Sequence, residues 1–165
     1  MRERRKSLTT PQSQTETDEL YMRAALREAA RAAAKDEVPV GAVVVKNGRI
    51  IAKAHNKRER SADPSAHAEF IAMVRAAKRI GNWRLDDCTL YVTLEPCPMC
   101  AGAISQARIE RLVFGAYDAA MGCTGSVYRI PEDPAFGHFC RSEGGVLREE
   151  CEKVIKEFFD KARRG

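Results

Sequence analysis

The chain has 165 residues, a length that favours one domain with its own apolar core. Hydrophobic residues make up 44% and charged residues 31% of it, as in an ordinary globular protein. No apolar run approaches the roughly 20 residues of a membrane-spanning helix, and no apolar signal segment follows the charged N-terminus. These features predict a cytoplasmic protein and no membrane partner.

The basic residues outnumber the acidic ones by 28 to 23, which gives a net charge of +5. The excess gathers at the two ends of the chain, in Arg2, Arg4, Arg5, Lys6, Lys161, Arg163 and Arg164. Such clusters fit a polyanionic partner, but from charge alone solvated tails are the favoured interpretation. Charge alone leaves both interpretations open.

Residues 1–17 are polar and predict a disordered basic tail, followed by a single domain over residues 18–165. Asp18 is the expected N-cap of a first helix that continues to about Lys35 with small apolar residues on one face. Two short β-branched runs, 40–45 and 50–55, then enclose Asn47-Gly48. This pair predicts a tight hairpin, because both residues tolerate positive φ.

The second half alternates predicted helices and strands. A helix follows residues 63–65, with Asp63 or Ser65 as its cap, and Pro98 is suited to the first turn of another. The remaining expected elements are a strand at 88–94, a helix at 98–107, a strand at 112–115, an irregular loop at 116–137, a strand at 138–142 and a helix at 147–162. This order predicts an α/β fold, with a mixed sheet of about five strands and helices on both faces.

Two segments carry the chemistry: His67-Ala68-Glu69 and Pro96-Cys97-Pro98-Met99-Cys100. His67, Cys97 and Cys100 form a three-donor set for Zn²⁺ that leaves the fourth coordination position to water, as in catalytic zinc sites. Zinc lowers the pKa of a bound water to near 7. Glu69 diverges from His67 on the same helix start, so we expect it to move protons rather than bind the metal.

The predicted helix starts favour this interpretation, because a helix N-terminus stabilises thiolates. Two alternatives remain open at this point. One is a redox Cys-x-x-Cys beside an incidental core histidine, and the other is a structural zinc site with His55 or His138 as the fourth ligand.

The His-x-Glu and Pro-Cys-x-x-Cys pair is a signature of zinc nucleobase deaminases, and from about Tyr21 to Arg164 the chain resembles the bacterial tRNA adenosine deaminases. The stretches that carry the resemblance are 37–43, 55–56, 63–69, 90–97, 99–104, 114–116 with Asp118, 125–126 and 158–159. The resemblance implies a three-layer cytidine deaminase-like fold, one Zn²⁺ per subunit and a homodimer. It also implies that adenosine is converted to inosine at the wobble position of a tRNA anticodon loop.

The resemblance further implies roles in substrate binding. Asn56 would bind the target base, Val40 and Ala68 would line its pocket, and Asp118 would contact the neighbouring sugar. His138, Phe159 and the basic end of the last helix would face the anticodon loop. The same residues have plainer interpretations: Asn56 can end a strand, Asp118 can cap a turn, and one of the two adjacent phenylalanines belongs in the core.

The chain departs from the family pattern on the substrate side. Gly137 replaces the usual asparagine, Phe139 replaces a basic residue, and residues 119–122, including Met121, lack a common lysine. These departures keep a second hypothesis open, a deaminase of free guanine, cytosine or adenine or of a nucleoside. A third hypothesis, an RNA-binding module with structural zinc only, has no use for Glu69.

Overall fold

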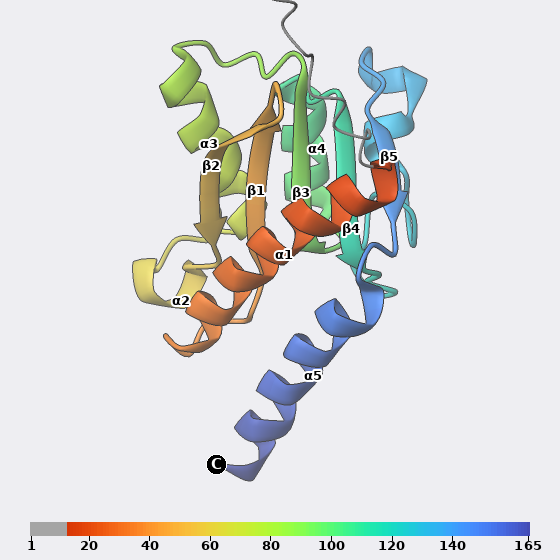
Figure 1. Cartoon of the computed structure of the whole chain (residues 1–165). Coiled ribbons are helices and arrows are strands. Elements are labelled where there is room, and N and C mark those ends of the chain that lie inside the picture. The colour runs from red at the N-terminus through yellow and green to blue at the C-terminus, as the bar shows by residue number, and fades with distance from the viewer. Residues whose placement is uncertain (1–12) are drawn as a thin grey trace, which may run out of the picture.

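The computed structural model describes residues 13–165, in which five strands form one sheet (Figure 1). The strands are β1 (Gly41–Lys46), β2 (Arg49–His55), β3 (Cys88–Leu94), β4 (Arg111–Ala116) and β5 (Arg141–Gly144). Their order is β2-β1-β3-β4-β5. β1 runs antiparallel to β2 and β3, while β3, β4 and β5 are parallel. The predicted mixed sheet is confirmed.

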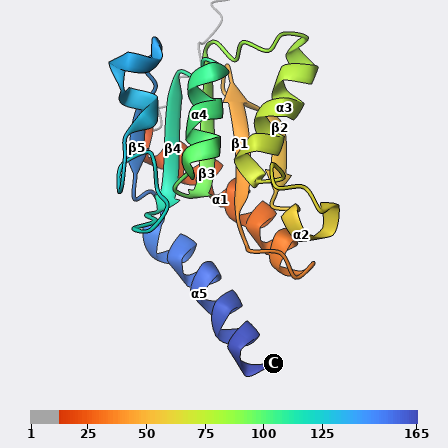
Figure 2. The ribbon, with the colours of Figure 1, turned by 180° about the vertical axis from the view of Figure 1, so that it is seen from behind.

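Helices cover both faces of the sheet and complete the three layers of the cytidine deaminase-like fold. The helices are α1 (Gln14–Ala33), α2 (Arg58–Ser61), α3 (Ala68–Ile80), α4 (Pro98–Gln106) and α5 (Arg148–Arg164). Figure 1 shows α1 across the front of the sheet and α5 extending below its lower edge, and Figure 2 shows α3 and α4 on the other face. None of the helices within residues 13–165 is both long and apolar enough to cross a membrane.

Side chains alternate along the central strands and build a core on each face of the sheet. Val44 and Leu90 are fully buried on the side of Ala72 in α3, while Val43 and Tyr91 are buried on the side of Met22 in α1. This alternation follows from the two-residue period of a strand. Both faces of the central strands are therefore apolar, as their continuous Val and Leu content predicts.

Helix α1 packs tightly against the sheet at Gly41, the first residue of β1. A methyl group there would overlap with the backbone of Ala25 and Ala29 in α1. The small side chains on the first helix are thus required by its contact with the sheet. The hairpin that follows is also as predicted, with φ of 52° at Asn47 and 72° at Gly48.

The first helix begins earlier than predicted and has a different cap. Ser13 accepts a hydrogen bond from the Glu16 backbone, the Glu16 side chain accepts one from Ser13, and the helix starts at Gln14. This is a capping box, which the order Ser-x-x-Glu permits. Asp18 is not the cap, and residues 14–17 of the predicted tail are helical. The basic cluster at residues 2–6 lies outside the described residues.

Two other elements also differ from the prediction. Neither Asp63 nor Ser65 caps α3, because the Asp63 carboxylate accepts hydrogen bonds from Ser65 and closes a turn; His67 is the N-cap instead. The last strand starts at Arg141 rather than residue 138, because the Cys140 backbone donates to Pro131 and belongs to the preceding turn. The short helix α2 was not predicted.

Asp18 lies at the centre of a buried polar network instead of at a helix end. Arg111 of β4 donates to both of its oxygens, at 2.8 and 2.6 Å, and the Tyr91 hydroxyl donates at 2.8 Å. Burial raises the pKa of Asp18, but these hydrogen bonds outweigh it and hold the pKa below its usual value. The network joins α1 to β3 and β4.

We expect Asp18→Asn to lower the free energy of unfolding by about 1.5–3 kcal/mol, because Arg111 loses its ion pair with Asp18 and keeps only the 2.6 Å pair with the partly exposed Glu143. Urea denaturation at pH 7 measures this, and Glu19→Ala on the same helix should change it by less than about 0.5 kcal/mol. Since the folded pKa is the lower one, the contribution of Asp18 is present above its ordinary pKa of 3.8 and disappears as the pH falls below it. Equal effects of the two variants would contradict the network.

Candidate active site

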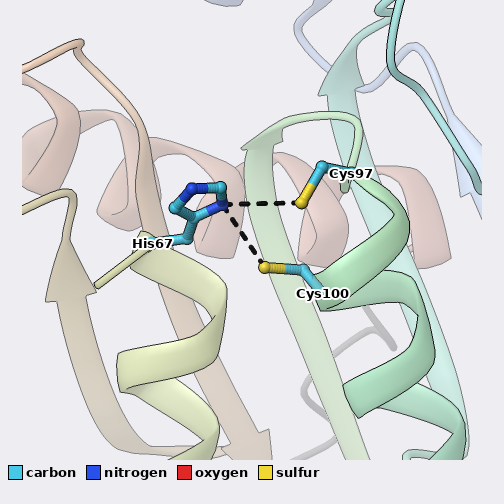
Figure 3. Close-up of side chains that lie close together, drawn as sticks. All are labelled: His67, Cys97 and Cys100. Carbon is cyan, nitrogen blue, oxygen red and sulfur yellow. Dashed lines mark hydrogen bonds between the residues drawn. The ribbon is translucent and has the colours of Figure 1, made fainter. Parts of the chain in front are cut away.

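Two helices begin side by side beyond the carboxyl end of β3 and bring three metal-binding side chains together (Figure 3). His67 is the N-cap of α3, Cys97 is the N-cap of α4, and Cys100 lies in the first turn of α4. Nδ1 of His67 lies 3.6 Å from Sγ of Cys97 and 3.5 Å from Sγ of Cys100. The predicted set of donors is therefore assembled.

These distances fit a tetrahedral zinc ion. Zn–S bonds of about 2.3 Å and Zn–N bonds of about 2.1 Å at the tetrahedral angle separate nitrogen from sulfur by about 3.6 Å. Within residues 13–165, His67, Cys97 and Cys100 are the one group of three or more His, Cys, Asp or Glu side chains close enough to share an ion. The site offers three protein donors and leaves one position to another ligand.

Neither histidine proposed as an alternative fourth ligand belongs to this group. Nδ1 of His55 lies 3.0 Å from the Glu28 carboxylate, and Nε2 of His138 lies 2.7 Å from the backbone oxygen of Ile109. Both rings are engaged by other partners. The geometry therefore favours an open site over a structural one with four protein ligands.

The two thiols are electrostatically different. A hydrogen bond from Cys100 lowers the pKa of Cys97 to about 4, and the same bond together with burial raises the pKa of Cys100. The hydrogen bond with Cys97 also raises the pKa of His67. The two thiols thus lie within hydrogen-bonding distance of the His67 ring, and a bound divalent cation would replace the protons that they share.

Glu69 follows the histidine by two residues and does not join the metal group. It is 4% exposed, its Oε2 atom has no hydrogen-bond partner, and burial raises its pKa. A buried carboxylate oxygen without a partner is costly, so its presence beside three metal donors indicates a chemical role. Its position agrees with the predicted proton shuttle.

A pocket of about 280 Å³ opens onto this group. The pocket is lined by four residues predicted as substrate contacts, Val40, Asn56, Ala68 and Asp118, and by His67, Glu69 and Cys97. Met121, one of the departures from the family pattern, also lines it, and four further lining residues were not singled out from the sequence: Val38, Arg58, Leu94 and Glu95. Glu95 could have been found from the sequence, since it directly precedes the Pro-Cys-x-x-Cys segment.

Asn56 and Asp118 line the pocket and also make hydrogen bonds to the nearby backbone, as their plainer interpretations predict. The Asn56 amide donates to the Val38 oxygen at 3.3 Å and accepts from the Arg58 backbone at 3.1 Å. The Asp118 carboxylate accepts from two backbone amides, those of Ala120 and Met121, both at 3.1 Å. These bonds fix the orientation of both side chains on the wall of the pocket.

The other two predicted substrate contacts lie away from this pocket. His138 is half-buried near the start of β4, and Phe159 is 43% exposed on α5. The rings of Phe158 and Phe159 meet edge to face, with centroids 5.4 Å apart. The structure therefore brings the three metal donors, Glu69 and four of the six residues predicted as substrate contacts together at one pocket.

The comparisons with known proteins agree with this geometry. A family model described as the cytidine and deoxycytidylate deaminase zinc-binding region matches residues 15–116. The chain belongs to this family of zinc deaminases. It is an enzyme that hydrolytically deaminates, and its donor set is the zinc site of the family.

Two of the similar proteins are tRNA deaminases. The deaminase is 50% identical over 147 residues to a tRNA-specific adenosine deaminase of Bacillus subtilis, which covers 89% of this chain and 91% of the relative. It also resembles a solved structure from studies of A-to-I editing by tRNA:A34 deaminases at the wobble position of transfer RNA. That match has a TM-score of 0.79 and 42% identity, over 82% of this chain and 98% of the other.

A third relative is a solved guanine deaminase from Bacillus subtilis. It matches with a TM-score of 0.59 and 44% identity, over 60% of this chain and 64% of the other. The chain thus shares its fold with a protein named for deamination of a free base, although the match covers a smaller part of the chain.

We expect Cys97→Ala to reduce bound zinc from one ion per chain to less than one tenth, because two remaining donors hold the ion weakly. Metal analysis after dialysis measures the content. Cys140→Ala is the matched control, since Cys140 is a free, fully buried cysteine outside the group. Full zinc content in Cys97→Ala, or its loss in the control, would contradict the assignment.

Proposed function

We propose that this deaminase converts adenosine to inosine at the wobble position of a tRNA anticodon loop. The observation that carries the proposal is the open three-donor set facing one pocket, with the buried Glu69 carboxylate beside it. The names of the relatives that cover most of the chain support the substrate. A loop nucleotide suits such a pocket because its base is already partly unstacked.

The reaction adds water to C6 of adenine and releases ammonia. When bound, zinc supplies Lewis acidity that makes water a nucleophile at neutral pH. Glu69 accepts the two protons of the attacking water one after the other, and it delivers the first to N1 of the ring and the second to the amino group, which leaves as ammonia. Its burial and raised pKa suit a group that both takes up and gives up protons.

The walls of the pocket hold the base for this attack. Val40 and Ala68 line the pocket with apolar surface, and Asn56 and Asp118 line it with polar groups. Asn56 would bind the base through its amide, and Asp118 would contact the neighbouring sugar. His138, Phe159 and the basic residues at the end of α5 are proposed to meet the rest of the loop. These assignments, together with a cytoplasmic location where tRNA is encountered, rest on the family resemblance.

Deamination of a free base is the second candidate, favoured by the guanine deaminase relative and by Gly137 and Phe139 on the substrate side. A free base needs only the pocket, whereas an anticodon loop also needs surface outside it. The two candidates are therefore separated by the size of the substrate that the enzyme accepts.

The zinc-loaded enzyme should form inosine at the wobble position of a stem-loop RNA with an ACG anticodon. Glu69→Gln, which keeps the shape of the side chain, should retain zinc and lose activity by at least about 100-fold because the proton carrier is removed. Nucleoside analysis of the digested RNA measures both. Turnover of free guanine, cytosine or adenine without any of the RNA would overturn the proposal.

We also propose that the enzyme is a homodimer and that the outer face of α3 and α4 forms the interface. A largely apolar groove of about 260 Å³ lies there, lined by Phe70, Met73, Val74, Ala77, Trp83, Leu85, Ala103, Gln106 and Ala107. Trp83 is 61% exposed and Val74 is 40% exposed. Large apolar side chains gathered on one face favour a protein partner, and the family resemblance names a second copy.

Trp83→Glu should convert the dimer into a monomer, because each copy would bury an unpaired charge in the same isologous interface. Light scattering during gel filtration measures the mass. Tyr128→Glu, at a 67% exposed aromatic residue outside this groove, is the control and should leave the dimer intact. A monomeric wild-type enzyme, or an unaffected Trp83→Glu dimer, would contradict this interface.

A further inference from the structure

Glu95 is a buried acidic residue at the substrate pocket that the reaction described above does not use. It follows β3 directly, precedes the metal donor Cys97 by two residues, and is 2% exposed. Its side chain lines the pocket together with Asp118 and Met121. A carboxylate in this place loses much of its hydration, so its partners must account for it.

The partner of Glu95 comes from a loop that also lines the pocket, through Asp118 and Met121. We name residues 118–126 the substrate loop. The hydroxyl of Ser126, at the end of this loop, donates to Oε1 of Glu95 at 2.8 Å. Within the described part of the chain, Ser126 is the residue whose side chain donates to this carboxylate, and the other oxygen, Oε2, is buried without a partner. A hydroxyl bonded to a buried carboxylate is among the stronger hydrogen bonds in proteins.

Shape complementarity joins the same two segments. The Glu95 carboxylate lies directly against Gly122, where a methyl group would overlap with its carboxyl atoms. The next residue of the loop, Cys123, donates its backbone N–H to the oxygen of Pro96 at 2.9 Å. The substrate loop is thus held at its middle and at its end by the two residues that precede Cys97.

We propose that Glu95 is a positioning residue whose hydrogen bond with Ser126 holds the substrate loop, and with it Asp118 and Met121, in place as a wall of the pocket. Because Glu95 and Cys97 belong to one short segment, the wall keeps a fixed position relative to the metal donors. The consequence for catalysis concerns binding of the nucleotide rather than proton transfer. This consequence rests on the proposed RNA substrate.

The test compares Glu95→Ala, Glu95→Gln, Ser126→Ala and the Glu95→Ala/Ser126→Ala double variant in zinc-loaded enzyme. With the stem-loop RNA, both alanine variants should raise KM about tenfold, as expected for loss of one hydrogen bond to a charged group, with a much smaller change in kcat. The double variant should be no worse than either alanine variant. Glu95→Gln keeps an oxygen that accepts from Ser126 and should recover most of the loss.

A general loss of stability would not produce this pattern. Ser142→Ala removes a hydroxyl that donates to the Cys140 oxygen away from the pocket, and it should leave KM unchanged. Additive losses in the double variant, a fall in kcat without a rise in KM, or a Glu95→Gln variant as poor as Glu95→Ala would overturn the inference.

Amide hydrogen exchange tests the loop independently of the substrate. Both alanine variants should raise the exchange rates of residues 118–126 at least tenfold, while the rates in β3 and α4 stay as in the wild type. Unchanged exchange in the substrate loop would overturn the inference even if the RNA is turned over. Faster exchange in the loop of an enzyme that does not act on the RNA would support the positioning role and count against the proposed substrate.

Discussion

His67 and Cys97 each cap a helix, and the two helices begin next to each other beyond the carboxyl end of β3. Because the two N-termini lie together, the caps and first turns of α3 and α4 are close to the pocket, whereas their later turns are not. The positive ends of two helix dipoles favour thiolates and a water-derived anion at the same point. The metal site, Glu69 and the floor of the pocket all follow from it.

The sheet maintains this arrangement from a distance. Parallel pairing of β3 with β4 fixes the level at which the segment 95–97 leaves the sheet, and the Asp18–Arg111 pair ties that part of the sheet to α1. Glu95 then couples the metal-binding turn to the substrate loop. Two buried acidic residues thus provide polar links between elements. Asp18 joins α1 to β4, and Glu95 joins the metal-binding segment to the substrate loop.

Much of this could be predicted because the signals are local. Asn47-Gly48, the β-branched runs and Pro98 determine the hairpin, the strands and the start of α4, and the spacing of His67, Cys97 and Cys100 determines the donors. The partners of Asp18 and Glu95 could not be predicted, since Arg111 and Ser126 are distant in sequence and their pairing depends on the tertiary fold. The bond between His138 and the Ile109 backbone oxygen could not be predicted for the same reason.

X-ray absorption at the zinc edge of the purified enzyme can show whether the zinc site is open, with three protein donors. An open site has two sulfur atoms at about 2.3 Å and two lighter atoms at about 2.0–2.1 Å, one from a single imidazole and one from a non-protein ligand. A shell with a third sulfur or a second imidazole would instead show a closed structural site and contradict the assignment of His67, Cys97 and Cys100 as an open set.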